Sequence, residues 1–180
     1  GKEIAEGVWE KLLPFAGYAF NKAHAVCYGM LAYQTPYLKA NFPVEYMAAL
    51  LAVYRDKEDR VVACIEDCRR MKIEVLQPDI NLSQMDFAVE VSGKTKKKQI
   101  RFGLAAIKGV GEGVVSALLA ERAENGPFFH LFEFAERMKL HGMNRTALEA
   151  LVKAGALYGL DPNRRKLMEM VDSALVFAET

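Results

Sequence analysis

Apolar residues recur at helical spacing over most of the chain. In the first 75 residues they lie three or four positions apart, which is the pattern of amphipathic helices. The helices predicted there span residues 1–13, 23–40, 44–54 and 57–71. Pro14 is expected to end the first helix and Pro36 to break or kink the second, because an interior proline lacks the N–H that the helix needs.

The spacing changes after residues 77–79, a Gln-Pro-Asp turn. Apolar and polar residues alternate over 87–91 and 99–104, with a charged connection at 92–98, which predicts a β-hairpin. Helical spacing then returns over residues 106–108, 112–122, 131–138, 145–154 and 162–177. The pattern therefore predicts a mostly α fold with one small β-hairpin and a boundary near residue 78.

Composition narrows the class of protein. The chain has 180 residues, is 52% hydrophobic and carries a net charge of +1, so it can form a packed core in one domain or two small ones. No apolar run is long enough to cross a membrane, and no signal peptide is apparent. The first residue is Gly1 rather than Met, which suggests a fragment or a processed chain.

The charge is unevenly placed. The first 90 residues carry a net charge of −3 and the remainder +4. No acid occurs between Glu90 and Glu112, and the cations of that stretch are Lys94, Lys96, Lys97, Lys98, Arg101 and Lys108. Such a stretch attracts polyanions at short range, although a solvated lysine loop would have the same composition.

Cysteine usage indicates a reduced, cytoplasmic protein, since the three cysteines Cys27, Cys64 and Cys68 are few and odd in number. Cys64 and Cys68 share one face of a predicted helix. A zinc site would need about two further ligands, and the histidines lie far away in sequence. We therefore expect no metal site, and buried cysteines that act as small apolar residues.

Residues 106–119 predict a short helix, a tight Gly-x-Gly turn and a second helix. Gly109 and Gly111 permit a positive φ, and the second helix begins with unpaired N–H groups that form an anion site. This resembles the helix-hairpin-helix motif, which grips DNA by its phosphates. The predicted DNA-binding residues are Lys94, Lys96, Lys97, Lys98, Lys108, Gly109, Val110, Gly111, Glu112 and Gly113. A glycine-rich helix connection without a ligand is the alternative, and a weaker second copy is predicted at 145–157, with Gly155 at its turn.

A second cluster lies at residues 15–25, where aromatic residues surround Asn21, Lys22 and His24. Lys22 and His24 could contact a phosphate, and Asn21 could contact a base or ribose. The alternative for His24 is a purely structural role, which is common for a histidine beside a helix start.

Residues 15–25 and 33–50 closely resemble the bacterial replicative DNA polymerase III alpha subunit family. Further matches lie at residues 79–81, 107–113, 144–145 and 151–156, so the resemblance covers nearly the whole chain. Ala23 stands where the family pattern has serine, whereas Asn21, Lys22 and His24 match it.

The resemblance implies a place for each segment. Residues 1–78 correspond to the C-terminal part of the fingers, 79–160 to the β-hairpin and helix-hairpin-helix unit, and 161–180 to a connecting helix. It implies incoming-nucleotide contacts at Asn21, Lys22 and His24, and primer–template DNA as a partner. The rest of the polymerase and the sliding clamp would join through segments that this chain lacks.

The catalytic Asp-x-Asp pair of that family, which holds Mg²⁺ on the palm domain, does not occur in this sequence. We therefore expect no cofactor in this chain and no polymerisation by it alone. The alternatives are an independent helix-hairpin-helix DNA-binding module and a structural helical domain that binds another protein.

Overall fold

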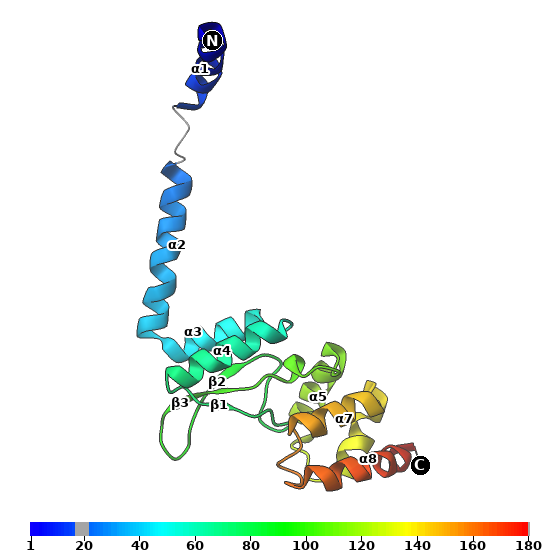
Figure 1. The fold of residues 1–180 in the computed structure, drawn as a ribbon. Coiled ribbons are helices and arrows are strands. Elements are labelled where there is room, and N and C mark those ends of the chain that lie inside the picture. Colours follow the sequence, from blue (N-terminus) through cyan, green and yellow to red (C-terminus); the bar gives the residue numbers. More distant parts are fainter. Residues whose placement is uncertain (17–21, 180) are drawn as a thin grey trace. The chain divides into compact units, whose positions relative to one another are not determined.

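The computed structural model describes residues 1–16 and 22–179, and these form two compact units, residues 1–43 and 44–180 (Figure 1). The first unit holds the helices α1 (Lys2–Ala16) and α2 (Lys22–Asn41). The second unit holds every described strand and the remaining helices.

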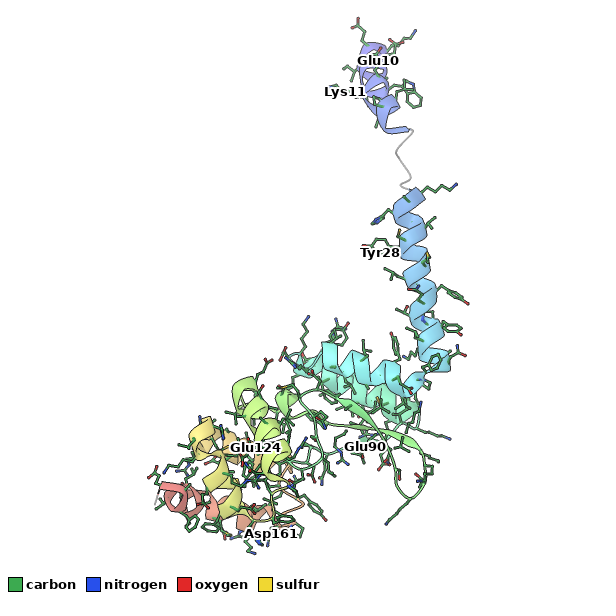
Figure 2. All side chains as sticks on the ribbon, turned by 180° about the vertical axis from the view of Figure 1, so that it is seen from behind. Glu10, Lys11, Tyr28, Glu90, Glu124 and Asp161 are labelled. Carbon is green, nitrogen blue, oxygen red and sulfur yellow. The ribbon has the colours of Figure 1, made fainter. Side chains whose placement is uncertain are left out.

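The helix α1 continues past Pro14 to Ala16 and α2 continues past Pro36 to Asn41, so an end at Pro14 and a break at Pro36 are wrong, whereas a kink at Pro36 stays a prediction. A proline removes one backbone N–H, and the turns on either side of it keep their own hydrogen bonds. At the residue before Pro36, the Thr35 hydroxyl donates to the Leu31 carbonyl at 3.0 Å. Figure 2 shows the side chains of α2, Tyr28 among them, pointing outward from the helix, and none of the described residues of α2 is buried.

The second unit confirms the expected mixture of many helices and a little sheet. Its helices are α3 (Pro43–Val53), α4 (Glu58–Arg70), α5 (Glu112–Asn125), α6 (Leu131–Met138), α7 (Arg145–Ala154) and α8 (Arg164–Glu179). Its short 3-10 turns are η1 (Leu104–Ala106) and η2 (Lys139–His141). Its strands are β1 (Val75–Leu76), β2 (Ala88–Val91) and β3 (Lys98–Arg101).

The sheet has the order β1-β3-β2. The predicted hairpin is the antiparallel pair β2–β3, in which Val91 faces Lys98 and Ala88 faces Arg101. β1 adds to the other edge of β3 in parallel, with Val75 opposite Ile100. Sequence reasoning missed β1, because two residues are too few to display a period of two.

Two hydrophobic clusters fill the second unit. In the first, α3 and α4 pack on the sheet, and Met47, Leu51 and Ile100 are fully buried. Cys64 and Cys68 of α4 belong to this cluster, as expected of small apolar residues. The compact units divide after Pro43, and the strands on both sides of residue 78 share a core with α3 and α4. The division into functional segments near residue 78 stays a prediction.

The second cluster lies among α5, α6, α7 and α8, which gather at the C-terminal side of the unit (Figure 1). The helix α8 packs across both α6 and α7. The rings of Phe128 and Phe134 meet edge to face in its interior, with centroids 4.9 Å apart. This bundle fixes the two helix starts that form the candidate site.

Candidate nucleic-acid interface

The first hairpin connects η1 to α5. Gly109 has φ +93°, which permits the chain to reverse. The side chains of Ile107 and Val110 are buried, and the N–H of Val110 donates to the carbonyl of Ile107 at 3.1 Å. The turn therefore forms at the predicted residues, but Val110 anchors it to the core and presents neither its side chain nor its N–H to a ligand.

The start of α5 is open. Gly111 caps the helix in an extended conformation, and no side chain accepts from the first-turn amides. A Cβ at Gly111 or Gly113 would meet no atom within 4 Å, so a ligand can approach the backbone closely. The amides of residues 111–114 have no partner one turn earlier, and with the helix dipole they form an anion site. Glu112 also lies here, and its carboxylate accepts from the Arg55 guanidinium.

A second hairpin connects α6 and η2 to α7. Gly142 has φ +78°, Met143 is buried, and Asn144 caps α7. The second copy predicted around Gly155 is therefore misplaced. Gly155 ends α7 in a left-handed conformation, and α8 begins only at residue 164.

The two hairpins correspond residue by residue at an offset of 33. Val110 matches Met143 at the tip, and both are buried. The next buried pairs are Val115 with Leu148 and Leu118 with Leu151. An internal comparison at this period would have found the second hairpin, although a Gly-x-Gly search could not, since Asn144 replaces the second glycine.

Each hairpin rests on the helix of the other. A Cβ at Gly109 would lie 3.4 Å from Cβ of Ala150 and 3.8 Å from Cγ2 of Thr146, both on α7. A Cβ at Gly142 would lie 4.0 Å from Cγ2 of Val114 on α5. This reciprocal packing holds the starts of α5 and α7 in a fixed relation.

A groove of about 610 Å³ lies between the first hairpin and α7. Its described lining includes the cations Lys108, Arg145 and Lys153, together with the acid Glu149. Glu149 accepts from Arg145 Nε at 2.8 Å and from Lys153 Nζ at 2.9 Å, and the Arg145 hydrogen bond is the main cause of a lowered Glu149 pKa. The groove keeps a net positive charge and suits an anionic chain.

The start of α7 is less open than that of α5. The Asn144 side chain accepts from the Ala147 N–H at 2.9 Å, which uses one first-turn amide. Arg145 is the first residue of α7, and its Nη1 also lies 3.0 Å from Oδ1 of Asp172 on α8. The second hairpin therefore offers mainly a fixed guanidinium, whereas the first offers free amides.

The predicted basic stretch separates into two places. The β2–β3 loop, with Lys94, Lys96 and Lys97, lies at the end of the hairpin that points away from α5 (Figure 1). Within the described residues, these three exposed lysines form no ion pair. The other cations of the stretch lie near acids: Lys98 contacts Glu45, Arg101 contacts Glu90, and Lys108 Nζ lies 4.0 Å from Glu58.

The predicted nucleotide-binding residues lie on the first unit. Asn21 falls outside the described residues. Lys22 begins α2 and is exposed, and the exposed His24 contacts the Tyr28 ring, with centroids 4.3 Å apart. The structure therefore places two of the three on the first turn of one helix.

Among the described residues, no three His, Cys, Asp or Glu side chains gather as a metal site. No helix in that part of the chain is long and apolar enough to span a bilayer.

The comparisons with known proteins agree with this geometry. A family model described as "Helix-hairpin-helix motif" matches residues 72–167, which include both hairpins.

The similar curated proteins are named DNA polymerase III subunit alpha. The one from Pseudomonas aeruginosa is 45% identical over 161 residues, which is 89% of this chain and 13% of that protein. The one from Thermus aquaticus is 44% identical over 179 residues, 99% of this chain and 14% of that protein. The one from Mycobacterium tuberculosis is 41% identical over 174 residues, which is 94% of this chain and 14% of that protein. The chain thus spans about one seventh of the length of these relatives.

Proposed function

Because the chain belongs to the helix-hairpin-helix family and is homologous to one segment of DNA polymerase III alpha subunits, we propose that residues 44–180 bind duplex DNA. The contacts would be made to the sugar–phosphate backbone and would be independent of base sequence. This DNA binding would serve DNA replication, within a polymerase of which this chain forms a part.

The observation that carries this proposal is the reciprocal pair of hairpins. Gly109 rests on α7 and Gly142 rests on α5, so the two helix starts are held as one surface. Backbone amides at the start of α5 and the guanidinium of Arg145 both suit phosphate oxygens. Such contacts position a protein on DNA without reading its bases.

The test is the affinity of the full chain for labelled duplexes of unrelated sequence, measured by fluorescence anisotropy at several salt concentrations. We expect similar affinities for all duplexes and a linear fall of log K with log salt. Replacing Lys108 and Arg145 by alanine should weaken binding and reduce the slope by about 1 for each phosphate that the variant no longer neutralises. Arg165→Ala, which removes an exposed cation of α8, is the matched control. Equal affinity in all variants would refute the interface.

The lysines of the β2–β3 loop enter this proposal as a second, separate contact. Because the loop lies at the far end of β3, its lysines would touch the duplex away from the hairpins. Alanine at Lys94, Lys96 and Lys97 should reduce the salt slope without changing the melting temperature, since these side chains are exposed. An unchanged slope would mean that the loop is only solvated.

We further propose that Asn21, Lys22 and His24 contact the incoming nucleotide in a polymerase that contains this segment. The exposed position of Lys22 and His24 on the first turn of α2 supports this role. Lys22→Ala in such a polymerase should raise the KM for dNTP, whereas Lys11→Ala on α1 should not. An unchanged KM in the Lys22 variant would refute the nucleotide contact at this residue.

The chemistry of polymerisation would come from residues outside this chain. The sequence has no Asp-x-Asp pair, and Mg²⁺-bound carboxylates are what in-line phosphoryl transfer requires. We expect no primer extension by the purified chain, and measurable extension would overturn this.

Within a polymerase, the exposed apolar side chains of α2, such as Tyr33 and Leu31, would pack on other parts of the enzyme. The sliding clamp would bind to segments outside this chain.

A further inference from the structure

Arg55, in the connection between α3 and α4, joins three carboxylates from three parts of the second unit. Its Nη1 donates to Asp86, its Nη2 donates to Glu112, and its Nε lies 3.8 Å from Asp56. The Arg55 side chain is only 20% exposed. The hydrogen bond to Asp86 is the main cause of a raised Arg55 pKa, so the guanidinium stays charged.

Glu112 is the partner that matters for DNA. It is the first residue of α5 and stands among the amides proposed to receive a phosphate. A carboxylate stabilises a helix start, but it repels a second anion at the same place. Pairing with Arg55 neutralises Glu112 and draws its carboxylate toward the α3–α4 connection.

Asp86 links Arg55 to the base of the same hairpin. The backbone of Asp86 lies against Gly103, where an added Cβ would stand 2.5 Å from the Asp86 carbonyl carbon. The N–H groups of Leu104 and Ala105 donate to the carbonyls of residues 84 and 85 at 3.0 Å each. Asp86 is therefore tied to η1 and the first hairpin. Arg55 contacts this segment at two residues, Asp86 and Glu112.

We propose that Arg55 is a positioning residue for DNA binding, which keeps Glu112 neutralised so that the start of α5 accepts a backbone phosphate. This rests on the proposed DNA-binding function. It assigns a part in that function to the α3–α4 connection, which lies outside the residues matched as helix-hairpin-helix.

The test is a double-mutant cycle on the full chain, with Arg55→Ala, Glu112→Gln and the double variant. Affinity for one fluorescein-labelled duplex is measured by anisotropy, alongside a thermal melt. Arg55→Ala should weaken binding by about tenfold, and the loss should shrink to about twofold or less when Glu112 is already glutamine. Glu112→Gln alone should keep or raise the affinity.

Two further variants sharpen the cycle. Arg70→Ala removes an equal charge from the exposed far end of α4, where Arg70 faces Asp67, and should leave affinity unchanged. Arg55→Lys keeps a charge but loses the planar fork that serves two carboxylates at once, so it should show a smaller loss that Glu112→Gln again cancels. The lysine variant also carries the test if the alanine variant fails to fold.

Two results would overturn the inference while leaving the proposed function intact. One is wild-type affinity in both Arg55 variants. The other is a loss of equal size with and without Glu112→Gln, which would mean a direct phosphate contact or a purely structural role. Absence of DNA binding by the wild-type chain would instead refute the proposed function itself.

Discussion

Gly109 of the first hairpin faces Ala150 of α7, and a Cβ at residue 109 would stand in ordinary van der Waals contact with the Ala150 Cβ, at 3.4 Å. The contact joins the turn of one hairpin to the helix of the other, and Gly142 makes the matching approach to Val114. The pair of hairpins is thus one packed body, and its stability and its DNA affinity should both depend on these glycines.

Gly109→Ala should destabilise the second unit. The position has φ +93°, a conformation that costs a residue with a Cβ about 1–3 kcal/mol. The free energy of unfolding in urea measures the loss. Gly113→Ala is the control, because Gly113 lies within α5 with nothing near its missing Cβ, and alanine there should leave stability equal or higher. Equal stability of the two variants would contradict the left-handed conformation of residue 109.

Gly103→Ala should be more damaging than Gly109→Ala. The added Cβ would meet backbone atoms of Asp86 and Phe87 at 2.5–2.7 Å, and backbone cannot yield as a flexible side chain does. We expect a loss of about 2 kcal/mol or more, in the range of overpacking. Gly93→Ala, where the space is open, is the matched variant for a urea titration, and it should behave as wild type. If Gly103→Ala has the same free energy of unfolding as Gly93→Ala, residues 86 and 103 do not approach this closely.

Asn144→Ala should weaken the start of α7. The Asn144 side chain accepts from the Ala147 N–H at 2.9 Å, and loss of such a cap costs about 1 kcal/mol. Asn144→Asp keeps an acceptor and should hold its stability in the same thermal melt. If the alanine and aspartate variants have the same melting temperature, the cap contributes nothing to stability.

Acid should destabilise the bundle through Glu121. The hydrogen bond from Arg137 is the main cause that lowers the Glu121 pKa below its ordinary value of 4.5, and Asn125 adds a second one. Because the folded pKa is the lower one, the stabilisation is present above the unfolded pKa and is lost as pH falls through the folded pKa.

The melting temperature should therefore fall more steeply for the wild type than for Glu121→Gln between about pH 6 and about pH 3. Glu124→Gln, on the same helix, serves as the control. Parallel curves for the wild type and the Glu121 variant would show that the Arg137 pair does not contribute to acid stability.

The sequence predicted the helices well, because their apolar spacing is a local signal. The first hairpin was found through its two glycines. The second has a weaker local signal, because Asn144 stands where the first hairpin has its second glycine. Arg55 could not be found at all, since its partners lie 31 and 57 residues away in the sequence. Ion pairs across such separations follow from packing, which has no local pattern.

The basic stretch shows what a charge count along the chain leaves out. Lys98 and Lys108 look like one patch in sequence, yet β3 and the turn after it separate them, and each lies near an acid. A charge count along the chain registers neither the length of a strand nor an acid brought in from α3 or α4. The cations of the groove, by contrast, come from one face of α7, where Arg145 and Lys153 lie about two turns apart, and from Lys108 of the first hairpin.

If the starts of α5 and α7 receive the DNA backbone, the chemical shifts of their backbone amides should change when DNA binds. On titration of the full, isotope-labelled chain with duplex DNA, we expect the largest shifts at the amides of residues 111–114 and 145–146. Those shifts should be the same for duplexes of unrelated sequence and should fade as salt is raised. Shifts confined to the β2–β3 loop, or no shifts at either helix start, would contradict it.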